Sequence, residues 1–272
     1  MFGSTVLEVA VGLTFCYATV ALIVSTVQEA LAAAFRLRAR TLLAGVKSML
    51  NDPRFTALAR GVYTHALVNP HDDTPAGSGG AVGAKPSYIE PGHFAIALLD
   101  TIASIPGDFV QLGRDIDALD DPQVRHVLQG IYRRADGDMA AFQLAVAGWF
   151  DSAMTRVSAA YTRSAMLISF LLSLLLAILF NIDSIHLFQA LWQHPSLAAQ
   201  LAAAPEAMNA QAVEALWRLP IGWQQFPPRF DGAFALNVAG WLLTASTALF
   251  GAPFWFELMK KTVQLRGGAP KP

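Results

Sequence analysis

Few residues in this sequence have the types and spacing that enzymes use. A glycine-rich stretch precedes Lys85, but a phosphate-binding loop needs Gly directly before the lysine and Ser or Thr after it, whereas Ala84 and Pro86 flank Lys85. His71, which two aspartates follow, has no second histidine at a spacing typical of metal sites. The sequence also lacks a Gly-x-Ser-x-Gly motif. We therefore expect no catalytic residue, no metal site and no cofactor.

Carboxylates that border long apolar stretches are the most plausible functional groups, because ionisable residues at membrane depth are costly and tend to be functional. At the ends of such stretches we expect them to be solvated or to cap helices. The alternative is that Glu29 and Glu257 face one another or pair with Arg36 or Arg163. The candidate carboxylates are Glu8, Glu29, Asp183 and Glu257.

The apolar stretches themselves are long enough to cross a membrane. Hydrophobic residues make up 54% of the 272 residues and charged residues only 14%, against roughly 25% charged in soluble domains. A membrane-spanning helix needs about 20 apolar residues, and residues 9–28, 164–182 and 232–256 carry no charge. We therefore predict an all-α integral membrane protein with three transmembrane helices, over 6–35, 164–182 and 232–257.

The distribution of Lys and Arg predicts the orientation. Residues 36–163 hold 13 of the 19 basic residues and the C-terminal tail holds 4, and basic residues near spans collect in the cytoplasm. We expect a bacterial inner-membrane protein with a periplasmic N-terminus and a cytoplasmic C-terminus. The parts outside the lipid are then a periplasmic tail (1–5), a helical cytoplasmic domain (36–163), a small helical periplasmic segment (183–231) and a cytoplasmic tail (258–272). The net charge of −1 gives no reason to expect nucleic acid as a partner.

Within the cytoplasmic domain, we expect a mobile loop over about 70–85, which is rich in Gly and Pro. Apolar residues then recur at helical spacing from about Asp138 into the second span without an intervening proline. This pattern predicts one helix of roughly 40 residues, about 60 Å long. Its apolar stripe must pack against the rest of the domain or against another chain, and so is a candidate assembly surface. The stripe comprises Trp149, Phe150, Ala153 and Val157.

Small residues and aromatic residues suggest how the spans pack and where they end. Pairs of small residues four apart let helices approach closely; candidates are Gly12 with Cys16, Ala235 with Ala239, and Thr247 with Gly251. Pro253 predicts a kink in the third span. Just beyond it, Trp255 followed by Lys260 and Lys261 resembles an aromatic belt with basic anchors at the membrane surface.

Two strings resemble a group of uncharacterised bacterial multi-span inner-membrane proteins: Gly148-Trp149-Phe150-Asp151-Ser152-Ala153 and Gly251-Ala252-Pro253-Phe254-Trp255-Phe256. The resemblance implies an inner-membrane location and no particular activity. Three functions are compatible with the sequence. The first is a non-catalytic scaffold or assembly protein that self-associates in the lipid bilayer, as a homo-oligomer or in a complex, and presents its cytoplasmic domain to a partner. The second is a subunit of an oligomeric pore or transporter, and the third is a membrane enzyme acting on lipid.

Overall fold

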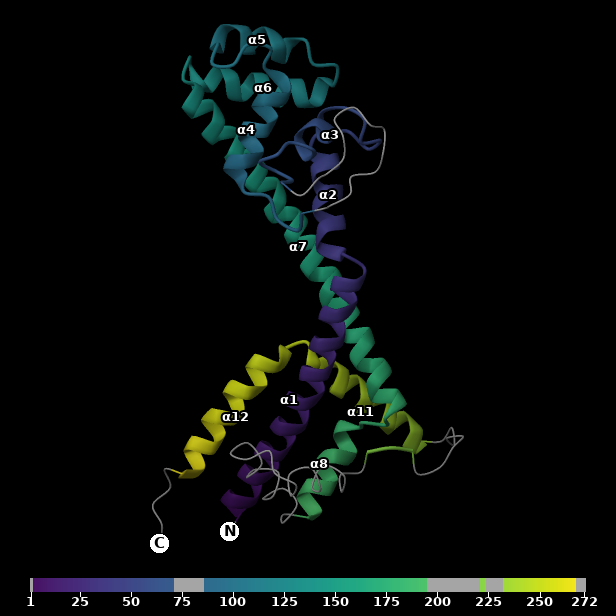
Figure 1. Cartoon of the computed structure of the whole chain (residues 1–272). Coiled ribbons are helices and arrows are strands. Elements are labelled where there is room, and N and C mark those ends of the chain that lie inside the picture. The colour runs from purple at the N-terminus through teal and green to yellow at the C-terminus, as the bar shows by residue number, and fades with distance from the viewer. Residues whose placement is uncertain (1, 71–85, 195–220, 224–231, 268–272) are drawn as a thin grey trace. The chain divides into compact units, whose positions relative to one another are not determined.

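The computed structural model describes residues 2–70, 86–194, 221–223 and 232–267 (Figure 1). These residues form ten helices and no strand, so the prediction of an all-helical chain is confirmed. The predicted mobile loop and most of the predicted periplasmic segment lie outside the described residues. The chain divides into two compact units. We call residues 32–163 the helical domain, and residues 1–31 with 164–272 the apolar unit.

The helical domain has a core of its own. Phe94 stacks on Phe150 with ring centroids 4.1 Å apart, and Phe109 stacks on Tyr132 at 4.4 Å. Asp121 opens one of the helices by accepting a hydrogen bond from the Val124 amide, as an N-cap residue does. The domain contains α2 (Leu37–Met49), α3 (Leu58–Tyr63), α4 (Pro91–Ile102), α5 (Phe109–Asp117), α6 (Pro122–Ala135) and the first part of α7 (Met139–Leu179).

α7 is one uninterrupted helix of 41 residues, in agreement with the long helix that the sequence predicts. Its residues before Ser164 belong to the helical domain and its remaining residues to the apolar unit. In the helical domain α7 packs closely on α2, because a Cβ placed on Gly45 would lie only 2.8 Å from a methyl carbon of Val157. Glycine at position 45 therefore permits this approach.

In the apolar unit, α1 (Phe2–Ala34) and α7 run in opposite directions. The Gln28 amide donates to the carbonyl of Ala165 at 3.3 Å, near the end of α1. Val20 and Val24 form one cluster with Leu172 and Leu176. Helix α8 (Ser184–Gln193) continues along α1 toward its beginning, where Leu187 and Leu191 cluster with Val9, Val11, Phe15 and Cys16.

The third predicted span does not form one helix. Instead α11 (Gly232–Ala248) and α12 (Gly251–Gly267) meet at a bend of 92°. α12 then returns alongside α1, because Ala252 and Trp255 cluster with Ala18 and Ala21, while Met259 joins the cluster near the beginning of α1 (Figure 1). By length and composition the described chain thus has two helices that could cross a membrane, or three if the bent pair counts as one span.

Candidate functional site: a buried polar cluster in the apolar unit

Polar side chains gather where α7 ends. Asn181 has a left-handed backbone conformation (φ 47°), which ends a helix as Gly or Asn commonly does. Its side-chain amide donates to the carbonyl of Gly222 at 3.1 Å, and its side-chain oxygen accepts from the Trp241 indole at 2.9 Å. The Trp223 indole donates to the carbonyl of Ile178 at 3.0 Å. These contacts satisfy backbone and side-chain groups that lipid could not.

Asp183 begins the next helix and is only 2% exposed. One oxygen, Oδ1, accepts from the amides of Ile185 (2.8 Å) and His186 (3.3 Å). The other, Oδ2, lies 3.5 Å from Nδ1 of the exposed His186 side chain. The opposite wall is Gly240 of α11, where a Cβ would fall 1.6 Å from Oδ1. The carboxylate thus occupies space that only glycine leaves free.

Hydroxyl groups complete the cluster. Ser184 Oγ and Thr244 Oγ1 are 2.8 Å apart and share a hydrogen bond. Thr244 Oγ1 also lies 2.8 Å from the carbonyl of Ile182, and the Tyr17 phenol is a hydrogen-bond partner of Ser184. Gly240, Thr244 and Ala248 recur every four residues on the buried face of α11, a spacing that allows helices to approach closely.

The break between α11 and α12 is also satisfied within the apolar unit. Gly251 has a positive φ of 75°, which favours glycine, and Pro253 lies in the first turn of α12, where a missing amide costs little. The Trp255 indole donates to the carbonyl of Thr247 at 2.8 Å and its ring lies 5.0 Å from that of Tyr17. The predicted kink is therefore a complete break that begins before the proline.

The cluster lies beside the middle of the charge-free stretch of α1. Its contact residue Tyr17 is 9 residues from Glu8 and 12 from Glu29, or about 14 Å and about 18 Å at 1.5 Å per residue. The α7–α8 break thus lies beside Tyr17, and the end of α11 lies beside Val20 and Val24, so both breaks adjoin the middle part of α1. Interrupted helices at membrane depth need buried partners or a water-filled cavity, and in transporters they form ion and substrate sites.

Among the four predicted carboxylates, only Asp183 belongs to this cluster. Glu8 is half-buried, whereas Glu29 and Glu257 are exposed. Glu257 follows Trp255, which packs at the level of Tyr17 to Ala21, so it does not face Glu29. Asp183 was expected at a span end, but the α7–α8 break brings it to the middle of α1. The described residues contain no group of three or more His, Cys, Asp or Glu that could hold a metal ion.

The predicted packing residues are correct only in part. Gly12 and Cys16 are buried, and Thr247 and Gly251 are half-buried at the helix break. Ala235 and Ala239, however, are exposed. The buried face of α11 begins one position after Ala239, because it contains Gly240, Thr244 and Ala248. Because α11 is almost uniformly apolar, its sequence gives no polar face from which the correct register could be read.

The predicted assembly stripe and one membrane anchor also have different surroundings from those expected. Phe150 and Ala153 are buried in the helical domain, and Trp149 and Val157 are partly buried there, so the stripe packs within its own domain. Trp255 is only 9% exposed because it packs on α1, and so it is not a surface anchor. Lys260 and Lys261 are exposed.

Most members of the cluster are not among the site residues predicted from the sequence: Asn181, Ser184, Gly240, Trp241 and Thr244. One signal was available, since an Asn two residues before an Asp follows a long apolar run, a pattern typical of a helix end followed by an N-cap. The partner residues on α11 are about 60 positions away, and nothing in the sequence pairs them with Asp183.

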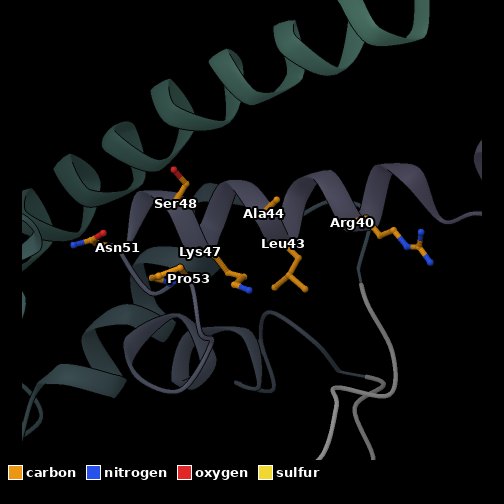
Figure 2. A pocket seen from close by; sticks show the side chains of 7 residues that line it. All are labelled: Arg40, Leu43, Ala44, Lys47, Ser48, Asn51 and Pro53. Atoms are coloured by element: carbon orange, nitrogen blue, oxygen red, sulfur yellow. The ribbon is translucent and has the colours of Figure 1, made fainter. Parts of the chain in front are cut away.

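The helical domain contains a different kind of surface, a basic groove of about 490 Å³ on the flank of α2 (Figure 2). Arg40 and Lys47 line it together with apolar and uncharged polar residues. The Lys47 Nζ atom lies 5.9 Å from the centroid of the Phe55 ring, within the range of a cation–π contact. The remaining lining residues are Leu43, Ala44, Ser48, Asn51 and Pro53.

Comparison with known proteins yields no match to a protein-family model, to a curated protein or to a solved structure.

Proposed function

We propose that this protein is a non-catalytic scaffold of the bacterial inner membrane, which self-associates through its apolar unit and presents the helical domain to a cytoplasmic partner. The observation that carries the proposal is the surface of α7. Only 11% of its membrane-length apolar window is buried within the chain. Leu167, Leu171 and Leu175, four residues apart, are 59%, 55% and 51% exposed, so this face is available to lipid or to another copy.

The polar cluster supports a structural role for the apolar unit. The side chains of Asn181, Asp183 and Thr244 all have partners from the same chain, and the hydrogen bond between Ser184 and Thr244 joins α8 to α11. The concentration of basic residues in the helical domain supports a cytoplasmic location for that domain. The resemblance to bacterial multi-span proteins supports the inner membrane.

Cysteine cross-linking in membranes tests self-association. In a Cys16→Ala background, we expect Leu171→Cys and Leu175→Cys to give disulfide-linked dimers under mild oxidation. Ser173→Cys is the matched control, because Ser173 lies between them on α7 but is completely buried, and it should remain monomeric. Absence of dimers at Leu167, Leu171 and Leu175 alike would contradict self-association through this face.

A second candidate, a subunit of an oligomeric transporter, is favoured by the position of the buried Asp183 at the break between α7 and α8. Carboxylates at such sites carry protons or bind cations in transporters. In proteoliposomes with an imposed proton gradient, this candidate predicts a proton flux that Asp183→Asn abolishes and that Glu257→Gln leaves unchanged. Proteoliposomes of the intact oligomer that remain proton-tight would leave the scaffold as the better proposal.

A further inference from the structure

The beginning of the helical domain carries positive charges and no negative ones. Residues 32–51 contain four basic residues and no Asp or Glu. Among the described residues, no carboxylate forms an ion pair with any of the four, since the ion pairs found within 4.0 Å all involve histidine. These cations therefore attract anions from their surroundings, because no acidic side chain of the described residues neutralises them. They are Arg36, Arg38, Arg40 and Lys47.

Two of these cations lie on the same side of α2. Arg40 and Lys47 are seven residues, or two helical turns, apart and line the basic groove together (Figure 2). Between them lie Leu43 and Ala44, which give the groove an apolar wall. Ser48 and Asn51 add uncharged polar groups at one end. The lining thus combines two positive charges, hydrogen-bonding groups and an apolar strip.

Two other grooves of the helical domain differ in charge. A groove of about 580 Å³ between α2 and α7 contains Arg38 but also Asp151. A smaller one of about 290 Å³ contains Arg156 as its only charged residue. The basic groove is therefore lined by two cations and by no carboxylate, although Asp121 is hydrogen-bonded to Asn51 at one end. This lining favours a ligand with a negative charge.

We propose that the basic groove binds the phosphate of an anionic phospholipid. Arg40 is only six residues beyond Ala34, the last residue of α1, and lipid headgroups gather where a span ends. Basic residues next to a transmembrane helix attract anionic headgroups. Arg40 and Lys47 then contact the phosphate, Ser48 contacts the polar part of the headgroup, and Leu43 and Ala44 contact the acyl chains. This inference does not depend on the proposed scaffold function.

The experiment measures binding of dioctanoyl phosphatidylglycerol to the full-length protein in a neutral detergent, from the rise in its thermal unfolding midpoint with lipid concentration. We expect the Arg40→Gln/Lys47→Gln variant to bind about 10-fold to 30-fold more weakly than the wild-type protein. Arg133→Gln/Arg134→Gln, which removes two exposed charges from α6 of the same domain, is the matched control and should bind within about twofold of the wild-type protein. Raising the salt concentration from 50 to 500 mM should weaken binding to the wild-type protein.

Comparison of ligands distinguishes a lipid from other anions. Dioctanoyl phosphatidylcholine, which is zwitterionic, should bind at least about 10-fold more weakly than the anionic lipid. Equal binding of inorganic phosphate and the anionic lipid would overturn the assignment to a phospholipid. Unchanged lipid binding by the Arg40→Gln/Lys47→Gln variant would overturn the site itself. If that double variant does not fold, Arg40→Gln alone decides, because Arg40 is exposed and its replacement should weaken binding without unfolding the protein.

Discussion

At the scale of single residues, Asp183 shows how a carboxylate that ends an apolar stretch in the sequence becomes a buried group in the structure. Burial of a charge without partners would cost several kcal/mol. Two backbone amides and the nearby His186 offset that cost. The space for the carboxylate comes from Gly240 on a different helix, so a glycine 57 positions away determines whether this aspartate can be buried.

Gly240→Ala should destabilise the apolar unit, because the added Cβ would fall 1.6 Å from Oδ1 of Asp183 and overpacking costs about 1–3 kcal/mol. Thermal unfolding of the full chain in detergent measures the loss. Gly148→Ala is the control, since nothing lies within 4 Å of its Cβ position in α7. That substitution should stabilise the protein by up to about 1 kcal/mol. Equal midpoints for the two variants would contradict the tight contact.

Tyr63→Phe should leave the protein as stable or increase its stability by about 1 kcal/mol. The Tyr63 hydroxyl is buried and has no hydrogen-bond partner among the described residues. Burial raises the pKa of Tyr63 to about 12, above its ordinary value, so the folded state favours the neutral phenol and loses stability as the pH rises from about 10 toward 12. Denaturant unfolding at pH 7 and pH 11 measures both effects. Tyr88→Phe, at a 72% exposed residue, should change neither.

At the scale of elements, helix ends determine how the chain is arranged. α7 ends at Leu179, and the N-cap residue Asp183 begins α8 within the apolar unit. α11 ends before Gly251, and the chain turns by 92° into α12. Each break exposes carbonyl groups that an indole of the same unit satisfies, Trp223 in the first and Trp255 in the second. Tryptophans that are elsewhere typical of membrane surfaces here hold broken helices together.

Trp255→Phe should loosen the α11–α12 break while keeping an aromatic ring against Tyr17. The loss is about 1 kcal/mol, since one hydrogen bond to the Thr247 carbonyl disappears and a weaker one from the Phe250 amide remains. Hydrogen exchange of the α11–α12 segment measures the loosening. Trp192→Phe, at an exposed tryptophan of α8, serves as the control. Equal exchange in both variants would show that the indole hydrogen bond does not hold the break.

The ends of α5 and α6 should make the helical domain sensitive to acid. Hydrogen bonds from the Ser104 amide and hydroxyl lower the pKa of Asp115. Those from the Val124 amide and Asn51 lower the pKa of Asp121. Both folded-state pKa values lie below the unfolded ones, so the stabilisation is complete above about pH 4 and is lost as the pH falls through the folded-state values.

Asp115→Asn and Asp121→Asn should therefore each reduce the loss of stability below pH 4, as unfolding of the full chain measured from pH 7 to pH 3 would show. Both variants should also be less stable than the wild-type protein at pH 7. Asp151→Asn is the control, because Asp151 is an exposed residue within α7. A wild-type acid profile in both end variants would contradict the role of these hydrogen bonds.

At the scale of the whole molecule, the chain consists of two units with separate cores, which α1 and α7 join covalently. In the apolar unit, α12 returns alongside α1 toward the beginning of that helix. If α1 crosses the membrane, this packing order favours a hairpin of α11 and α12 that dips into the lipid without crossing it. The end of α12 then lies on the same side of the membrane as the N-terminus. The basic tail alone favours the opposite side.

Labelling of single cysteines in intact cells decides between these two arrangements. In a Cys16→Ala background, we expect a membrane-impermeant thiol reagent to label Thr5→Cys and Lys261→Cys from the same side of the membrane. Arg54→Cys, in the helical domain, should be protected under the same conditions. Labelling of Thr5→Cys together with protection of Lys261→Cys would show that the two ends lie on opposite sides of the membrane, as three complete membrane crossings require.

Features that depend on local composition and on helical periodicity can be predicted from the amino-acid sequence alone. Two of the three charge-free apolar stretches lie in single helices long enough to cross a membrane, whereas the third is divided between α11 and α12. The absence of proline between Asp138 and Ile182 predicted α7, because proline lacks the amide hydrogen that a continuing helix needs. These features need no knowledge of which helices are neighbours.

Which helix faces pack together, in contrast, is visible only in the folded chain. The buried face of α11 contains Gly240, Thr244 and Ala248 rather than Ala235 and Ala239, and the α7 stripe around Phe150 packs within its own domain. Asp183 lies beside the middle of α1 because α8 continues along the same helix. Small and apolar residues can pack against many different neighbours. The alignment of two helices is therefore set by the close contacts between them, and the sequence of either helix alone does not specify it.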